Sequence, residues 1–75
     1  MTAEEILTEI LRFMRDYLGI DAVDDLDLIA AGVDSLRIEE LGAFIELRFS
    51  VPASRLSLRD APTPAALAAW VARAR

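Results

Sequence analysis

Apolar residues recur at helical spacing in three stretches of this chain, and no stretch shows the alternation of apolar and polar residues that is typical of a strand. The first stretch begins at Thr2 and Glu5, which have the spacing of a capping box. Gly19 suits its end, because glycine tolerates the left-handed conformation of a helix C-cap. The residues between them predict an amphipathic helix whose apolar arc faces a core. That arc consists of Ile6, Leu7, Ile10, Leu11, Phe13, Met14, Tyr17 and Leu18.

The second helical stretch runs from Asp34 to about Phe49 and carries two apolar stripes. One stripe has core spacing and includes Gly42, which allows close helix approach despite a cost of about 1 kcal/mol relative to alanine. Its other members are Ile38, Leu41, Ile45 and Phe49. The opposite stripe lies beside Glu40 and consists of Leu36, Ala43 and Leu47. Because so small a domain cannot easily bury both sides of one helix, we expect this second stripe at the surface, where isolated leucines are also common without a role.

The last third of the chain predicts a short helical turn and a final helix. The turn lies around residues 54–59, with Leu56 and Leu58 pointing inward. Thr63 is a suitable N-cap, and Pro64 suits the first helical position after it. The apolar face of this helix is Leu67, Trp70, Val71 and Ala74. The sequence therefore predicts an all-α fold, a small bundle of three principal helices plus one short helix, with Phe13, Leu41, Ile45 and Trp70 as large core side chains.

The connection between the first two helices has no sustained period and is rich in aspartate. Its expected core anchors are Val23, Leu26, Leu28 and Ile29. Its aspartates are Asp21, Asp24, Asp25 and Asp27. They lack EF-hand spacing and its closing glutamate, so solvation is favoured over a calcium site and no metal ligand is predicted.

The composition excludes several functions. There is no cysteine and no histidine among the 75 residues, so disulfides, cysteine-based metal sites and a Ser-His-Asp triad are ruled out. Thirteen acidic against eight basic residues give a net charge of −5, which argues against nucleic acid and anionic membranes and favours a basic protein partner. No apolar run is long enough to span a bilayer, and the amino terminus lacks a cationic secretion signal. We therefore expect a cytoplasmic protein.

Residues 32–36, with the sequence Gly-Val-Asp-Ser-Leu, place the hydroxyl of Ser35 at the start of the second helix. A helix N-terminus has unpaired amide donors and the positive end of the dipole, so a phosphodiester on Ser35 would be stabilised there. Taken alone, the tripeptide 34–36 is explained more simply, because aspartate and serine are common capping residues. The context of the whole chain decides between the two interpretations.

These features together resemble the acyl carrier and peptidyl carrier protein family, over almost the whole chain. The matching segments are Asp27-Leu28, residues 32–36, Glu40-Leu41, residues 49–52 and residues 61–68. The resemblance implies that residues 1–75 form a single carrier domain and that a phosphopantetheinyl transferase attaches phosphopantetheine from coenzyme A to Ser35. It also implies that Asp34 helps to orient the transferase's metal and coenzyme, and that Leu36 contacts the transferase or later enzymes. The arm would carry acyl or aminoacyl groups as thioesters, while the protein itself, expected to be a monomer, is not an enzyme.

For a fatty-acid carrier, the family resemblance implies a strongly acidic second helix. The second helix of this chain differs from that pattern. Here Arg37 and Arg48 lie along one flank, and Glu39 and Glu46 lie along the other. Residues 58–63 look more like those of carriers in nonribosomal peptide or polyketide assembly. We therefore expect a discrete carrier of that kind, with a housekeeping fatty-acid carrier as the alternative. The start at Met1 without a preceding linker favours a free-standing protein, although a domain excised from a larger synthase would look the same.

The expected partners are the transferase, an acyl- or aminoacyl-loading enzyme, and downstream synthase or tailoring enzymes. The expected contact residues on the second helix are Leu36, Arg37, Glu40, Ala43 and Leu47. A different class remains open at this point, in which the chain is an unmodified helical interaction module that uses the same stripe and has Ser35 only as a cap. A hydrolase with Ser35 as nucleophile is disfavoured because the chain has no histidine base and no Gly-x-Ser-x-Gly motif.

Overall fold

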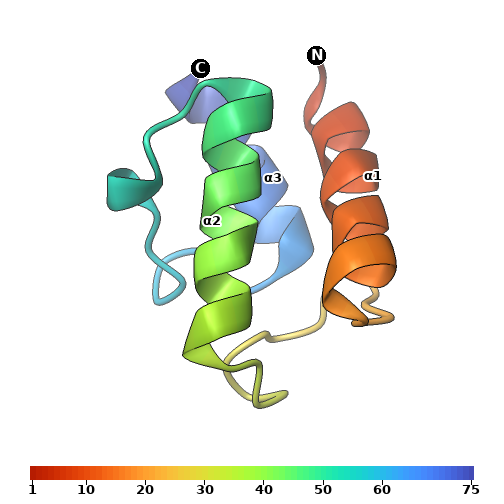
Figure 1. Cartoon of the computed structure of the whole chain (residues 1–75). Helices are drawn as coiled ribbons and strands as arrows, with labels where there is room; N and C mark the ends of the chain where they lie inside the picture. Colours follow the sequence, from red (N-terminus) through yellow and green to blue (C-terminus); the bar gives the residue numbers. More distant parts are fainter.

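Three helices and two short helical turns make up the protein, and no strand occurs in the part of the chain that is described. The computed structural model describes residues 1–75, apart from the side chain of Ala53. The elements are α1 (Ala3–Phe13), the π-helix η1 (Met14–Leu18), α2 (Ser35–Phe49), the 3-10 turn η2 (Ala53–Arg55) and α3 (Pro64–Ala74). This confirms the all-α prediction. In Figure 1, α1 runs downward while α2 and α3 run upward, so both chain ends lie at one end of the bundle and the connection 19–34 closes the other.

Helix α1 begins with the predicted capping box. The Thr2 amide donates to the Glu5 carboxylate at 2.8 Å, and the Glu5 amide donates to the Thr2 hydroxyl at 3.2 Å. The helix then widens into η1 and ends at Gly19, whose φ of 69° is left-handed, as expected for a C-cap. The π turn was not predicted, and it places Tyr17 at the surface, 77% exposed, where the sequence had placed it on the core arc.

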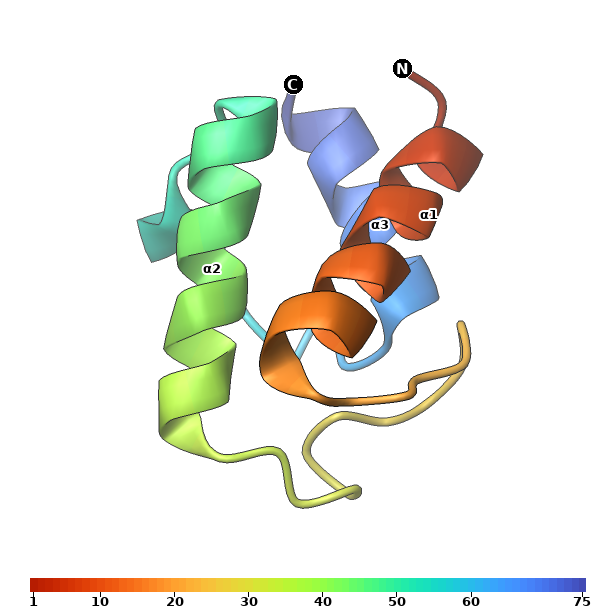
Figure 2. The ribbon, with the colours of Figure 1, turned by 45° about the vertical axis from the view of Figure 1, so that its right-hand side comes forward.

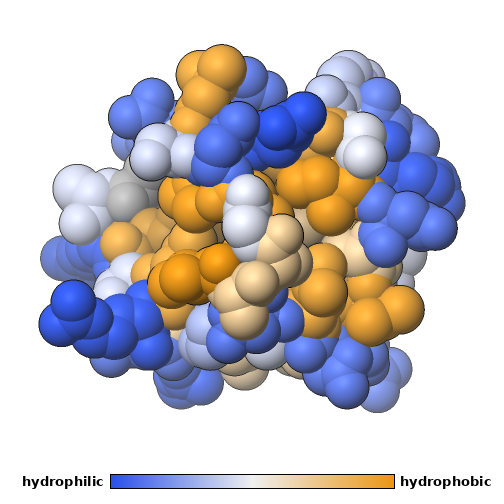
Figure 3. All heavy atoms as spheres, turned by 90° about the horizontal axis from the view of Figure 1, so that it is seen from below, coloured by the Kyte–Doolittle hydropathy of each residue, from blue (hydrophilic) through white to orange (hydrophobic). Residues whose placement is uncertain are grey.

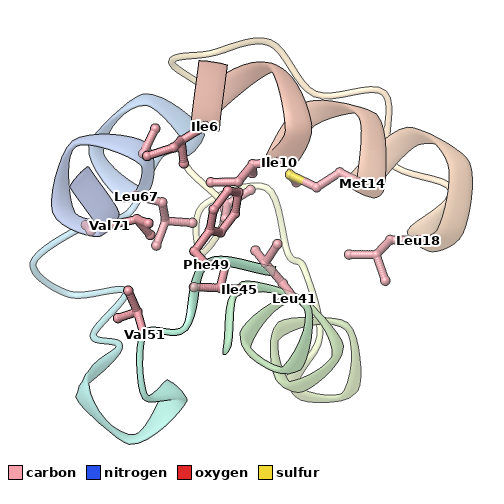
Figure 4. Close-up of a cluster of buried hydrophobic side chains, with 13 residues drawn as sticks. Ile6, Ile10, Met14, Leu18, Leu41, Ile45, Phe49, Val51, Leu67 and Val71 are labelled. Atoms are coloured by element: carbon pink, nitrogen blue, oxygen red, sulfur yellow. The ribbon is translucent and has the colours of Figure 1, made fainter. Parts of the chain in front are cut away.

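The core lies between the three helices, and Figure 4 shows the ring of Phe49 at its centre, with Ile10 from α1 and Leu67 from α3 beside it. Every residue of the core is apolar. The buried members are Ile6, Ile10, Met14, Leu18, Leu28, Leu41, Ile45, Phe49, Val51, Ala61, Leu67, Ala68 and Val71. Leu41 and Ile45 are buried as predicted. Phe13 and Trp70 pack against the core but are only partly buried, so the prediction that they are buried was wrong. Ala74 is exposed, so the prediction that it lies on the apolar face toward the core was also wrong.

The connection 19–34 is held under the bundle by one buried side chain and by backbone hydrogen bonds. Leu28 is completely buried, its amide donates to the Pro62 carbonyl at 2.8 Å, and its carbonyl accepts from the Val33 amide at 3.1 Å. Leu26 is partly buried, but Val23 and Ile29 are exposed, which corrects their predicted role as core anchors. Other loop side chains that pack against the core while remaining partly exposed are Ile20, Ala22, Leu26 and Val33.

The segment after α2 forms a shorter turn than predicted, since η2 covers only Ala53–Arg55. Leu56 and Leu58 follow it and are packed against the core while remaining partly exposed. Thr63 then caps α3 as predicted, because its hydroxyl accepts from the Ala66 amide at 3.1 Å. Figure 2, turned by 45°, shows how the loop passes below the lower ends of α1 and α2, so that the start of α2 is presented at this end of the molecule.

Candidate functional site

Asp34 and Ser35 have different roles at the start of α2. Asp34 is the N-cap, with extended backbone, and its carboxylate accepts from the Arg37 amide at 2.9 Å. Ser35 is the first helical residue, and its hydroxyl takes part in no hydrogen bond among the described residues. The helix therefore does not need Ser35 as a cap. The capping interpretation holds for Asp34 and fails for Ser35.

The turn before the cap depends on Gly32. Its φ of 80° is left-handed, and its amide donates to the Ile29 carbonyl at 3.0 Å. A Cβ built on Gly32 would meet no atom within 4 Å, so the backbone conformation, and not crowding, favours glycine at this position. The turn delivers Asp34 and Ser35 to the open end of α2.

The surroundings of the Ser35 hydroxyl fit a phosphodiester. Ser35 is exposed, and no described hydrogen bond uses the amides of Ser35 and Leu36, whereas the Arg37 amide is taken by Asp34. Two free donors at the positive end of the helix dipole stabilise an anionic oxygen. In the described structure no titratable side chain is buried and no set of three potential metal ligands gathers. The site can thus hold a phosphate on Ser35, while the surrounding side chains offer no buried acid or base.

Arg37 connects the start of α2 to the end of η1. Its Nε donates to the Leu18 carbonyl at 3.1 Å, and its Nη1 lies 3.1 Å from the Asp34 carboxylate. The sequence predicted Arg37 at a partner surface, but two of the five N–H groups of its guanidinium form hydrogen bonds within the fold. No sequence signal pointed to this contact, because it joins residues nineteen positions apart.

The second stripe of α2 is at the surface, as predicted. Leu36 is 64% exposed and Leu47 is 87% exposed, and both Ala43 and Glu40 are exposed as well. Figure 3 views the end of the molecule formed by the loop and the start of α2, where apolar side chains gather in the middle and charged ones lie around them. The exposed large apolar residues of this end include Val23, Ile29 and Leu36. An exposed apolar area of this kind is suited to contact with another molecule.

A groove of about 620 Å³, which was not predicted from the sequence, lies between α2 and the helix formed by α1 and η1. Its floor holds three aromatic rings in a row. Phe13 stacks on Phe44 with centroids 4.3 Å apart and on Tyr17 with centroids 5.3 Å apart. The full lining is Phe13, Tyr17, Glu40, Ala43, Phe44, Leu47 and Arg48. The four-residue spacing of Phe13 and Tyr17 could have indicated that their rings lie side by side. It did not indicate a surface groove, because in an unbroken α-helix both rings would face the core.

Arg48, which lines this groove, forms an ion pair with a residue of α1. Arg48 binds Glu9 through two hydrogen bonds, from Nε at 2.6 Å and from Nη2 at 2.9 Å, and so joins α2 to α1. The Arg48 guanidinium also lies 5.5 Å from the centre of the Phe49 ring. Glu40, which lies on the same helix and also lines the groove, forms no ion pair with a described residue. The lining of the groove thus contains one paired arginine and one carboxylate outside any ion pair.

None of the helices in the described part of the chain has the length and apolarity that a bilayer span requires. In a comparison with protein families, the model described as "Phosphopantetheine attachment site" matches residues 8–71. No curated protein and no solved structure matches the chain.

Proposed function

The chain belongs to the phosphopantetheine attachment family and is a carrier domain, and we propose that Ser35 is the residue to which its prosthetic group is joined. The observation that carries this assignment is the exposed Ser35 hydroxyl, unused by the fold and next to two unpaired amides at the start of α2. Asp34 already caps the helix, so modification of Ser35 would cost the helix no hydrogen bond. In this proposal, residues 1–75 form a single carrier domain.

The hydroxyl oxygen of Ser35 forms the new bond in the attachment reaction. It attacks the phosphorus that carries the pantetheine half of coenzyme A, the pyrophosphate bond breaks, and the adenosine bisphosphate leaves. The hydroxyl proton passes to a base of the phosphopantetheinyl transferase, because this chain has no histidine and no buried carboxylate. When bound, the group supplies a thiol that holds acyl or aminoacyl groups as thioesters.

Two neighbours of Ser35 would assist the transferase. Asp34 uses one carboxylate oxygen for the cap and the other for Arg37, and remains exposed toward the solvent, where it can help to orient the enzyme's metal and coenzyme. Leu36 presents an exposed side chain directly beside the attachment point. It would contact the transferase first and the later enzymes afterwards.

Partner enzymes would dock on the outward side of α2. The proposed contact residues are Leu36, Arg37, Glu40, Ala43 and Leu47. An interface used for brief delivery is small, with a few apolar anchors supplying much of its energy and rim charges guiding encounter. The carrier would act as a monomer in the cytoplasm with a loading enzyme and with synthase or tailoring enzymes, while it performs no chemistry itself.

The pathway we favour is polyketide or nonribosomal peptide assembly, with fatty-acid synthesis as the alternative. The first turn of α2 contains no acidic residue, and Arg37 lies among its exposed side chains. This supports a partner surface that differs from a uniformly acidic one. The cargo, whether acyl, aminoacyl or polyketide, is chosen by the loading enzyme.

Thiol labelling tests the attachment site, because the chain contains no cysteine and the arm would supply its only thiol. After incubation with coenzyme A and a promiscuous transferase, a maleimide dye should label the wild type. It should also label Ser54→Ala, a matched control at another exposed serine. Ser35→Ala should remain unlabelled. Labelling of Ser35→Ala, or no labelling of the wild type, would refute the assignment.

A further inference from the structure

Arg37 forms more bonds at the start of α2 than the cap of the helix requires. Its backbone amide donates to Oδ1 of Asp34 at 2.9 Å, and this bond makes Asp34 the N-cap. Its side chain adds a second bond, from Nη1 to Oδ2 of the same carboxylate at 3.1 Å. One residue therefore binds both oxygens of Asp34, although only the first bond is needed to cap the helix.

The guanidinium of Arg37 is itself held by a different element. Its Nε donates to the carbonyl of Leu18 at 3.1 Å, and Leu18 is the buried last residue of η1. The last carbonyls of a helix lack partners within the helix and form the negative end of its dipole, so a cation is favoured there. Arg37 thus connects the end of η1 to the carboxylate that precedes Ser35.

The ion pair between Arg37 and Asp34 affects geometry more than stability. The two side chains are 49% and 56% exposed, and solvent screens so exposed a pair. The last torsion of an aspartate side chain is broad, so a carboxylate bound through one oxygen can still rock about its Cβ–Cγ bond. With both oxygens bound to an anchored arginine, the plane of the Asp34 carboxylate is held.

These bonds leave Asp34 able to bind a metal ion. A carboxylate has about four lone-pair sites, so two hydrogen bonds do not exhaust its capacity. In the proposed function this carboxylate helps to orient the transferase's metal and coenzyme next to Ser35. Groups that hydrogen-bond to a metal-binding side chain fix its orientation, and their loss commonly changes metal affinity or activity by about 10- to 100-fold.

We propose that Arg37 is a positioning residue for the attachment reaction, which, anchored on the Leu18 carbonyl, holds the Asp34 carboxylate in the orientation that the transferase's metal requires. This role rests on the proposed function, since it requires attachment at Ser35. It is separate from any direct contact of Arg37 with a partner enzyme, because it acts through Asp34. It also makes the attachment site depend on where η1 ends.

Arginine suits this role better than lysine. A guanidinium presents its N–H groups in a rigid plane, so that Nε and Nη1 face Leu18 and Asp34 at the same time. A lysine has one nitrogen on a flexible stem and keeps the charge without the fixed geometry. Arg37→Lys therefore separates positioning from charge, whereas Arg37→Gln removes both.

The kinetics of attachment test this role, with a phosphopantetheinyl transferase, coenzyme A, magnesium and the apo protein as the varied substrate. Intact mass first establishes that wild type gains one phosphopantetheinyl group, and its absence would overturn the proposed function itself. We expect Arg37→Lys and Arg37→Gln each to lower kcat about tenfold. The magnesium concentration that gives half the maximal rate should rise in both variants, while KM for the protein changes less.

Arg15→Gln is the matched control, because Arg15 also bonds an aspartate, Asp16, at 2.9 Å, but both residues belong to η1. It should leave kcat and the magnesium requirement unchanged. A wild-type kcat in Arg37→Lys, or a change in KM alone in both Arg37 variants, would show that Arg37 acts only as a direct contact. Either result would overturn the positioning role while leaving Ser35 as the attachment site.

A double-mutant cycle tests whether Arg37 acts through Asp34. Asparagine caps a helix as well as aspartate does, so Asp34→Asn should fold, which its melting temperature checks. In the Asp34→Asn background we expect Arg37→Gln to lower kcat by less than about twofold, because the carboxylate that it positions is already absent. An equal loss in both backgrounds would overturn the positioning role.

The anchor on Leu18 can be tested in the apo protein without any enzyme. In nuclear magnetic resonance spectra, the Nε–H of Arg37 should exchange with water more slowly than the Nε–H of Arg55, which is exposed in η2. Equal exchange rates would show that the anchor is not kept in solution, and the positioning role would then be wrong whatever the kinetics of the variants.

Discussion

The two sides of α2 carry similar apolar residues, but one side is buried and the other is exposed. On the inner side Leu41 is 2% exposed, with Ile45 and Phe49 equally buried, whereas on the outer side Leu47 is 87% exposed. The inner side packs against α1 and α3, whereas Ala43 and Leu47 of the outer stripe line the open groove. The difference teaches that one helix can serve stability on one side and contact on the other, with Ser35 at its open end.

The largest expected effect separates the two sides by stability. Leu41→Ala removes a buried side chain and should cost about 2–5 kcal/mol of unfolding free energy, a large share of what so small a domain has. Leu47→Ala, with the same chemical change at an exposed position, should stay within about 0.5 kcal/mol of wild type. Chemical denaturation of both variants measures the contrast, and two equal losses would show that the outer stripe is also core.

A smaller effect is expected at Arg37, which lies on the outer side but bonds to the Leu18 carbonyl. Arg37→Gln should destabilise the fold by about 1 kcal/mol, because one hydrogen bond between η1 and α2 is lost. Arg55→Gln, at an exposed position in η2, is the matched control and should change stability little. Thermal melts that place the two variants together would remove the structural role of Arg37, which the sequence alone did not indicate.

A change on the outer side of α2 should also slow the rate at which partner enzymes modify or load the protein. With transferase or loading enzyme below saturation, Leu47→Ala should slow transfer about fivefold, which corresponds to about 1 kcal/mol of lost contact energy. Truncation of Arg73 to alanine on α3 is the control for an exposed side chain away from α2. Unchanged rates for Leu47→Ala with every partner enzyme would exclude this stripe from docking.

The smallest effect concerns α1, away from both sides of α2. The Thr2 amide and hydroxyl hold the pKa of Glu5 below its usual value of 4.5. Because the folded-state pKa is lowered, this contribution to stability is present above the unfolded pKa and is lost as pH falls through the folded one. The relevant range is about pH 5 to about pH 3, which brackets the ordinary pKa of a glutamate. Lowering the pH through this range should lower the melting temperature of wild type slightly more than that of Glu5→Gln. Parallel pH dependences would show that the capping box contributes nothing measurable.

The helices were predictable from sequence because caps and apolar spacing are local signals. Thr2, Asp34 and Thr63 all cap as expected. Four members of the predicted core stripe of α2 are buried, namely Leu41, Gly42, Ile45 and Phe49, but Ile38 is only partly buried, because it lies in the first turn of the helix, near the open end of the bundle. The π turn of η1 was not predictable, since an apolar arc at α-helical spacing does not announce a widened turn. The exposure of Tyr17 and the aromatic groove follow from that turn.

The candidate site was predictable in part. Ser35 lies at the open end of α2 because it directly follows the N-cap Asp34 and precedes the apolar helical pattern, and both signals are visible in the sequence. The contact between Arg37 and Leu18 depends on how α2 meets η1, and the exposure of Val23 and Ile29 depends on the backbone bonds that hold the loop. Such tertiary contacts have no local signature in the sequence.

The intact mass of the protein isolated from its native host tests whether the chain is a carrier, because one spectrum reports the arm and any cargo on it. We expect a mass that exceeds that of the chain by one phosphopantetheinyl group, with or without a thioester, and a fragment spectrum that places the group on Ser35. The bare mass of the chain, unchanged after incubation with coenzyme A and a transferase, would contradict this expectation.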